Sequence, residues 1–349
     1  MTMPDSNSAM TAMLSEAREA PQVVARLLAD NAALCRDLGE RLRASPPPFA
    51  VTCARGSSDN AATFVKYLLE IHSGLVTASV GPSVTSVYDA RPRMRDALFL
   101  AVSQSGRSPD ILHLAQAGRD DGALTVALVN DTSSPLASTC EVVLPLHAGS
   151  EKSVAATKSF IAALAAGFQL VAHWSQDQEL LTALETLPEA LEKAAALDWS
   201  AALPELSQAN NLFVVGRGVG FAVAQEAALK LKETSGVHAE AMSAAELMHG
   251  PWTLAGEHFP IFVISQRDET LSGVNDLVTK LRQQDVPVVV AGAAEGPASV
   301  MLPSVEQVHP YLAPIAMIQS FYPLVNAIAL ARGRDPDSPP RLRKVTETV

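Results

Sequence analysis

The sequence predicts an α/β protein built from two tandem, doubly wound units, each a parallel sheet flanked by helices. Short apolar runs typical of buried strands alternate with longer segments of helical periodicity, which is the pattern of a parallel sheet. The same order of elements returns in the second half of the chain. A length of 349 residues suits two domains that each bury their own core.

The first half begins with a helical arm. Apolar residues recur at helical spacing over residues 11–43, and the helix should end at Ser45 because three prolines follow it. A Gly-Ser turn and a helix through Phe64 then follow the first strand. The expected strands of this half are 49–54, 75–80, 97–102, 124–129 and 141–146.

The second half repeats this order, beginning with a strand at 211–215 and a helix through Leu229. Its remaining strands are expected near 237–241, 260–265, 286–291 and 306–309. The resulting division is a helical arm (1–45), a first domain (46–180), a helical linker (181–207), a second domain (208–330) and a polar, Pro-rich tail (331–349).

The composition argues for a soluble globular protein, since 48% of the residues are hydrophobic and 18% are charged. The net charge is -11 and no Lys/Arg cluster stands out, so we expect no nucleic-acid partner. The cysteines share no metal-like spacing and are too few for a disulfide framework, which suits a reducing compartment. They are Cys35, Cys53 and Cys140.

No secretory signal is visible at the N-terminus. The most apolar long stretch, residues 153–175, contains Lys158 and is rich in alanine, which favours a buried helix over a membrane span. We therefore expect a cytoplasmic protein without a membrane, metal or cofactor partner.

The run SQSGRS at residues 103–108 directly follows an apolar strand and precedes a helix that begins near Pro109. Hydroxyl groups and backbone N–H groups at the start of a helix stabilise an anion, and Gly106 allows a close approach of the backbone. These features predict a phosphate site. The alternative is a Ser-rich turn that only caps its helix. The candidate side chains are Ser103, Gln104, Ser105 and Ser108.

A second hydroxyl-rich turn, RGSS at residues 55–58, follows the first strand. Both turns should open at the carboxyl edge of one sheet, where ligands bind in open α/β folds, so Gly56, Ser57 and Ser58 join the predicted site. In the second half the matching turn at residues 265–269 carries two carboxylates and no glycine. We therefore expect phosphate binding in the first half only.

Six motifs then appear in a fixed order across nearly the whole chain: SQSG, VAATKSF, GRG, EAALKLKE, HAEAMSAAELMHGP and LRKVT. Together they resemble the isomerase half of glucosamine-6-phosphate synthase, and SQSG resembles the broader sugar isomerase (SIS) domain family. The resemblance implies two tandem SIS domains and a phosphorylated sugar as ligand.

The resemblance also implies roles in catalysis. Glu233 matches the family's base, which moves a proton between two sugar carbons, a task for which a placed carboxylate is suited. Lys230 lies three residues earlier on the same helical face and could stabilise developing oxygen charge. Without the resemblance, the two residues would be an ordinary pair on an exposed helix face. Lys232 points elsewhere and is expected to be solvated.

Three further positions match the family. His249 matches the histidine that opens the sugar ring from a neighbouring subunit, which implies a homodimer. Lys344 matches a tail lysine that forms an imine and closes the site, although it could also be a flexible basic residue. Val154 matches a position that lines the sugar pocket through its backbone. Ala156 replaces a serine and Arg55 is unusual in the first turn, so the substrate could differ from that of the synthase.

The synthase carries a glutaminase domain before its isomerase half. Only a helical arm precedes the first strand here, and no early cysteine is present. We therefore expect the releasing reaction, in which glucosamine 6-phosphate gives fructose 6-phosphate and ammonia, as in stand-alone SIS-type deaminases. The alternatives are a deaminase or deglycase for galactosamine 6-phosphate or a fructosamine-type 6-phosphate, and a non-catalytic phosphosugar-binding regulator.

Overall fold

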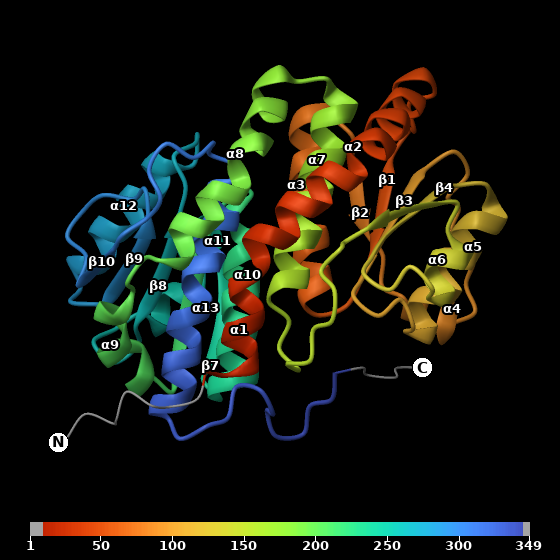
Figure 1. Ribbon diagram of the computed structural model, residues 1–349. Helices are drawn as coiled ribbons and strands as arrows, with labels where there is room; N and C mark the ends of the chain where they lie inside the picture. Colours follow the sequence, from red (N-terminus) through yellow and green to blue (C-terminus); the bar gives the residue numbers. More distant parts are fainter. Residues whose placement is uncertain (1–9, 345–349) are drawn as a thin grey trace.

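Within residues 10–344, which the computed structural model describes, two parallel five-stranded sheets form the body of the protein (Figure 1). They confirm the predicted α/β class. The strand order is β2-β1-β3-β4-β5 in the first sheet and β10-β9-β8-β6-β7 in the second. The first sheet comprises β1 (Ala50–Cys53), β2 (Thr77–Ser79), β3 (Leu98–Ser103), β4 (Leu124–Val129) and β5 (Val142–Pro145). The second comprises β6 (Asn211–Gly216), β7 (His238–Ser243), β8 (Ile261–Ser265), β9 (Val288–Gly292) and β10 (Val300–Leu302).

The first strand of each sheet is flanked on both sides, and this arrangement positions the site. Val51 of β1 pairs in parallel register with Ala78 of β2 and with Phe99 of β3. The order of the chain therefore reverses between β1 and β3. In open α/β sheets ligands bind at such a reversal, outside the carboxyl ends of the strands. The turns that follow β1 and β3 lie at this point.

Helices cover the faces of both sheets (Figure 1). In the first half they are α1 (Ala12–Arg18), α2 (Ala20–Ala44), α3 (Ser57–Ser73), α4 (Ser83–Ser86), α5 (Pro109–Asp121), α6 (Pro135–Thr139), α7 (Lys158–Ser175) and α8 (Gln178–Ala195). In the second half they are α9 (Leu203–Gln208), α10 (Gly220–Lys230), α11 (Ala244–Leu247), α12 (Leu271–Arg282) and α13 (Ala313–Ala331). Short turns of 3₁₀-helix span Ser200–Ala202 and Pro251–Leu254, and a π-helical turn spans Leu231–Ser235.

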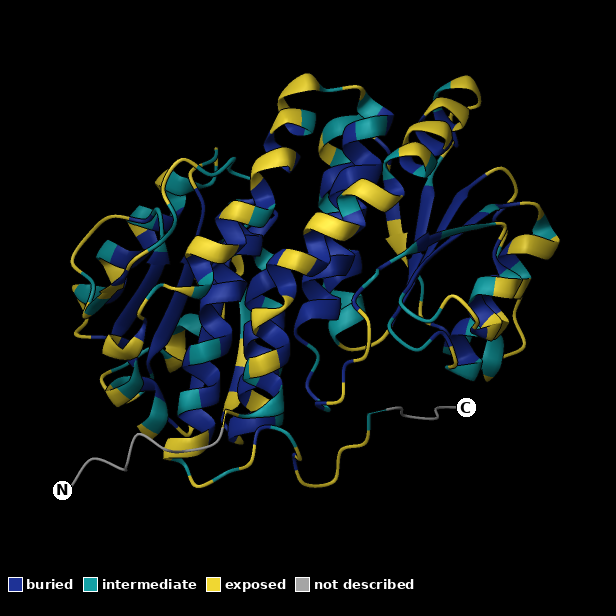
Figure 2. Cartoon of the chain, viewed as in Figure 1, coloured by how far each residue is buried: buried dark blue, intermediate teal, exposed yellow. Residues whose placement is uncertain are grey.

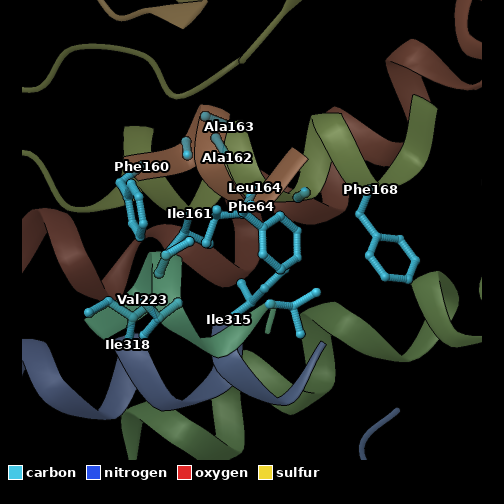
Figure 3. Close-up of a cluster of buried hydrophobic side chains, with 14 of the residues drawn as sticks. Phe64, Phe160, Ile161, Ala162, Ala163, Leu164, Phe168, Val223, Ile315 and Ile318 are labelled. Carbon is cyan, nitrogen blue, oxygen red and sulfur yellow. The ribbon is translucent and has the colours of Figure 1, made fainter. Parts of the chain in front are cut away.

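The core lies between the two sheets, where α3, α7, α10 and α13 pack together (Figures 2 and 3). Phe64, Phe160, Val223 and Ile318 each come from a different one of these helices and meet in the centre (Figure 3). Gly167 permits the close approach of α3 and α7, because a Cβ atom there would lie 2.2 Å from Val65. The two sheets thus share one helical layer and its core, and each sheet has a further buried cluster of its own.

Helix α13 is long and apolar enough to cross a membrane, but 78% of its apolar window is buried inside the protein. It is the one such helix among the described residues. Its apolar side chains pack into the shared core, where Ile315, Phe321 and Val325 are fully buried. This is the pattern of a central helix in a folded domain.

Two predicted elements differ from the structure. The strand expected at 306–309 is wrong, since the last strand is β10 at Val300–Leu302. Pro303 follows it and has no N–H to donate to a neighbouring strand, so pairing stops there. The ring of His309 instead packs edge-on against Tyr311 at 5.3 Å. The helix expected over 11–43 is divided at Glu19, because Pro21 starts a new helix there.

Candidate active site

A pocket of about 360 Å³ opens at the carboxyl edge of the first sheet. It lies where the turns after β1 and β3 meet a turn of the second domain and the C-terminal tail. All eight predicted phosphate and substrate residues line it, as do Glu233 and Lys344. Its lining residues are Arg55, Gly56, Ser57, Ser58, Val102, Ser103, Gln104, Ser105, Ser108, Ile111, Val154, Ala156, Glu233, Leu342, Arg343 and Lys344.

The turn after β3 has the shape of an anion cradle. The Ser103 hydroxyl accepts the Gly106 N–H at 2.9 Å, which tightens the turn. Gly106 has φ +63°, and a Cβ atom there would lie 2.2 Å from Oγ of Ser134, so this position requires glycine. Ser108 is the N-cap residue of α5, but its side chain makes no capping hydrogen bond. Ser108 is instead one of the residues that line the pocket.

An ion pair joins the two turns. Nε and Nη2 of Arg55 donate to Oδ2 of Asp110 at 3.0 and 2.7 Å. Asp110 lies fully buried in the first turn of α5, whereas half of the Arg55 side chain is exposed along the pocket wall. Asp110 therefore orients the guanidinium, and the pocket gains a cation beside its hydroxyl groups.

Helix α10 of the second domain reaches the first domain through a buried network. Nζ of Lys230 lies 3.1 Å from Oγ of Ser57 and 3.3 Å from Oε1 of Glu226, and it also contacts Oε2 of Glu233. Nδ2 of Asn60 donates to Glu226 at 2.9 Å. Residues 226, 230 and 233 share one face because they are four and three residues apart, and a π-helical turn begins directly after Lys230.

The charges of this network shift the pKa values of its members. Burial alone would lower the pKa of Lys230, but the carboxylates of Glu226 and Glu233 together raise it. Burial and the charge of Glu233 raise the pKa of Glu226, against the opposing effect of Lys230. Lys230 is thus held as an ammonium behind Glu233, whose side chain is 22% exposed and faces the pocket. A carboxylate backed by a fixed cation suits proton transfer to a bound ligand.

The loop between β5 and α7 forms another part of the pocket wall, through Val154 and Ala156. Glu151 is buried in it and accepts hydrogen bonds from the Thr157 N–H, the Ser159 N–H and the Ser159 hydroxyl. Lys344 of the tail completes this set, since its Nζ lies 2.9 Å from Oε2 of Glu151 and 2.7 Å from the Ser153 carbonyl oxygen. Burial alone would raise the pKa of Glu151, but Lys344 and these donors together lower it. The tail is therefore fastened to the pocket wall.

His249 lies elsewhere in the described chain. It is exposed in the segment after α11 and is not part of the pocket lining. Its neighbours Met248 and Leu254 are exposed apolar residues. Lys232 is exposed, as predicted for a solvated lysine.

Sequence reasoning missed Glu226, which contacts Lys230, and Asn60, which donates a hydrogen bond to Glu226. A usable signal was present for Glu226, since it lies four residues before Lys230 and therefore on the same helical face. Asn60 offered no such signal, because its partner Glu226 lies 166 residues later in the sequence, in the other domain.

The corresponding edge of the second sheet also has a hollow, of about 570 Å³. Its walls include the turn after β8, where Asp268 accepts hydrogen bonds from the Thr270 N–H and hydroxyl at 2.9 and 2.5 Å. Arg267 lies there together with the carboxylates Glu295 and Glu306. This carboxylate-lined edge lacks the hydroxyl cradle of the first domain.

Comparison of the chain with known proteins identifies its family. The SIS domain model matches residues 50–173 and 205–297, one segment for each sheet. The chain belongs to the SIS domain family. The tandem arrangement of two SIS domains, predicted from the repeated motifs, is confirmed.

Relatives of this SIS protein include glutamine–fructose-6-phosphate aminotransferase of Thermotoga maritima, which is 32% identical over 84% of this chain and 50% of its own length. The chain thus spans about half the length of the curated relatives that it matches. A solved structure from Silicibacter pomeroyi, provisionally named a phosphosugar isomerase, is 42% identical and covers 94% of this chain and 100% of its own, with a TM-score of 0.89. Glucosamine-6-phosphate deaminase of Thermotoga maritima shares the fold, with 18% identity over 97% of this chain and 100% of its own, and a TM-score of 0.75.

Proposed function

We propose that this SIS protein is an amino-sugar-phosphate deaminase that converts glucosamine 6-phosphate and water to fructose 6-phosphate and ammonia. The observation that supports this most is the position of Glu233. Its carboxylate faces the same pocket as the hydroxyl cradle, so a sugar held by its phosphate presents its carbon chain to a base.

The residues of the pocket divide the reaction between them. The cradle, with Gly56, Ser57 and Ser58, binds the phosphate through N–H and hydroxyl donors. Glu233 takes the proton from C2 of the open-chain sugar and returns it to C1, which gives a ketimine at C2. Lys230 stabilises the oxygen charge that develops during this transfer. Water then adds to the ketimine and ammonia leaves.

Lys344 and His249 act outside the proton transfer itself. Lys344 closes the pocket by joining the tail to its wall, and an imine with the ketose is a further possible role of its amine. His249 opens the sugar ring from the partner in a homodimer, since the exposed segment that carries it is outside the pocket of its own chain. The pocket requires no metal or cofactor for this chemistry.

The releasing direction requires fewer reagents than synthesis. Release of ammonia needs only water, whereas synthesis from fructose 6-phosphate needs an ammonia source such as a thiolate that cleaves glutamine. All three cysteines of the chain are buried, and burial raises the pKa of each thiol to about 12. None of them is a reactive thiolate at neutral pH. Buried, unpaired thiols also suit the proposed cytoplasmic location.

The test is to incubate purified protein with glucosamine 6-phosphate and to measure ammonia and fructose 6-phosphate together. Equal amounts of both products are expected, and Glu233→Gln should lower the rate about 10²–10⁴-fold because it removes the base. Glu240→Gln, a change at an exposed carboxylate outside the pocket, is the matched control. Activity that survives unchanged in Glu233→Gln would contradict the assignment.

A second candidate is favoured by Arg55 and Ala156, which line the pocket where the sequence departs from the synthase pattern. A guanidinium beside the ligand and the loss of a hydroxyl would suit a different phosphosugar. Galactosamine 6-phosphate and a fructosamine-type 6-phosphate should therefore be assayed in parallel with glucosamine 6-phosphate. A regulator without catalysis would bind these sugars and release product from none of them.

A further inference from the structure

We propose that Glu16, on the N-terminal helix α1, is a positioning residue that holds the pocket wall and the tail lysine in their working places. Glu16 does not line the pocket. Its effect would pass through the loop of residues 151–157 to Lys344. The inference concerns the geometry of the proposed deaminase site. Its turnover test rests on the proposed function, whereas its hydrogen-exchange test does not.

Glu16 grips two successive amides of the loop. One carboxylate oxygen accepts the Lys152 N–H, and the other accepts the Ser153 N–H at 3.1 Å. The Glu16 side chain is buried, with a residue exposure of 6%, so water competes little for these hydrogen bonds. Two adjacent amides that share one carboxylate leave the peptide planes of this segment little freedom to rotate.

The gripped segment is the one that receives Lys344. The Ser153 N–H binds Glu16, while the Ser153 carbonyl oxygen accepts a hydrogen bond from Nζ of Lys344 at 2.7 Å. The next residue, Val154, lines the pocket. Glu151 holds the same loop from inside through Thr157 and Ser159. Two buried carboxylates therefore hold the loop, Glu16 near its start and Glu151 where it joins α7.

Helix α1 also holds the tail. The carboxylate of Asp337 accepts the N–H groups of Ala12 and Met13, both at 2.7 Å, at the start of α1. An acidic side chain is favourable at this end of a helix. The tail thus contacts α1 at Asp337 and reaches the pocket wall seven residues later at Lys344. The tail and the loop of the pocket wall meet at Lys344, and both are bound to helix α1.

The helix itself is anchored to the core. Oγ1 of Thr11 donates to Oδ1 of Asn326 at 2.6 Å, and Nε2 of Gln319 donates to the Ala17 carbonyl oxygen at 3.0 Å. Both partners belong to α13, and Figure 1 shows α1 beside that helix. Glu16 therefore transmits the position of the rigid second-domain helix to a loop of the first domain.

The first measurement is hydrogen–deuterium exchange, which needs no substrate. Glu16→Gln keeps the size of the side chain but leaves one of the two loop amides without an oxygen acceptor. We expect exchange in a peptide covering residues 149–157 to become about tenfold faster, while peptides of the sheets stay unchanged. Asp121→Asn is the matched control, because Asp121 accepts the Met94 N–H in a loop away from the pocket. Unchanged exchange at 149–157 would overturn the proposal.

The second measurement is a double-mutant cycle on turnover. Glu16→Gln should lower kcat/KM about tenfold in the wild-type background and less than twofold in a Lys344→Ala background, since coupled residues are not additive. Equal effects in both backgrounds would show that Glu16 acts without Lys344, against the proposal. If Glu16→Gln unfolds, Asp337→Asn tests the same coupling from the tail. A wild-type protein that releases no ammonia contradicts the proposed function alone, because exchange at 149–157 still decides the role of Glu16.

Discussion

Nζ of Lys344 lies 2.9 Å from Oε2 of Glu151, so the C-terminal tail ends its described course on a buried carboxylate of the first domain. The tail leaves α13 of the second domain and runs along one side of the molecule to reach this point (Figure 1). Glu151 also accepts three hydrogen bonds, one from Thr157 at the end of its loop and two from Ser159 in the first turn of α7. The contact therefore couples the position of the tail to the position of the pocket wall.

This contact predicts a stability difference that depends on pH. The folded state holds the pKa of Glu151 below its ordinary value of 4.5. A carboxyl of this kind stabilises the fold above its unfolded-state pKa, and the contribution is lost as the pH falls through the folded-state pKa. Lys344→Met removes one cause of the shift. The Tm difference between wild type and Lys344→Met should be largest at neutral pH and should shrink below about pH 4.5.

Lys66→Met is a suitable control for that experiment, because Lys66 lies 4.0 Å from Glu70 on the surface of α3. Exposed pairs of this kind contribute little to stability, so its Tm difference should stay small at every pH. A Lys344→Met difference that did not change between pH 7 and pH 3 would contradict the role given to Glu151.

The cradle can be tested at Gly106. Gly106→Ala adds the strain of a positive φ and a collision with Ser134, whereas Gly74→Ala at φ +61° adds strain in open space. Gly74→Ala should cost about 1–2 kcal/mol of unfolding free energy. Gly106→Ala should cost more and should weaken fructose 6-phosphate binding at least tenfold, which denaturant titration and calorimetry would measure. Equal effects of the two variants would argue against a rigid cradle.

The buried network predicts a non-additive result. Lys230→Met leaves the carboxylates of Glu226 and Glu233 without their cation, which should cost about 3–5 kcal/mol of unfolding free energy. The double variant Glu226→Gln/Lys230→Met removes one of the two negative charges and should recover part of that loss. Urea unfolding of both variants gives the comparison. A double variant less stable than Lys230→Met alone would show that charge balance does not hold this network together.

Ser57 and Ser58 should differ in their effects on kinetics. Lys230 donates to the Ser57 oxygen, and the Ser57 hydroxyl is itself hydrogen-bonded to Glu226, so Ser57 connects the cradle to the buried network. Ser57→Ala should therefore lower kcat as well as raise KM, because Lys230 loses a partner. Ser58→Ala should mainly raise KM. Steady-state kinetics of the two variants separate these outcomes, and identical changes in both constants would contradict the link between the cradle and Lys230.

Much of the fold followed from local patterns in the sequence. The inner strands of both sheets are apolar runs, as buried parallel strands require, whereas the edge strands β2 and β7 are more polar. Nine of the expected strands match strands of the structure. The tenth was placed too late because β10 is a short edge strand of three residues whose middle residue, Met301, is half exposed. Such a strand carries little of the apolar signal on which the prediction depended.

The site was less open to prediction wherever its contacts join distant segments. The cradle could be found because hydroxyls and glycine directly follow a strand. Glu16 could not be found in this way, because its significance arises from the amides of Lys152 and Ser153, which are 136 and 137 residues away. A hydrogen bond to a backbone N–H group cannot be predicted from the types of the residues that carry it. His249 likewise stays outside the pocket of a single chain.

The reversal of strand order between β1 and β3 places the cradle in one domain, and the π-helical turn after α10 brings Glu233, the proposed base, from the other. Neither half of the chain alone contains a complete pocket. A cut between the domains would therefore separate anchoring of the ligand from its chemistry, and mixing the two halves should restore both only if they dock. If the proposed roles hold, the second sheet is required for a complete site although it has no cradle of its own, and one copy of the repeat would not suffice.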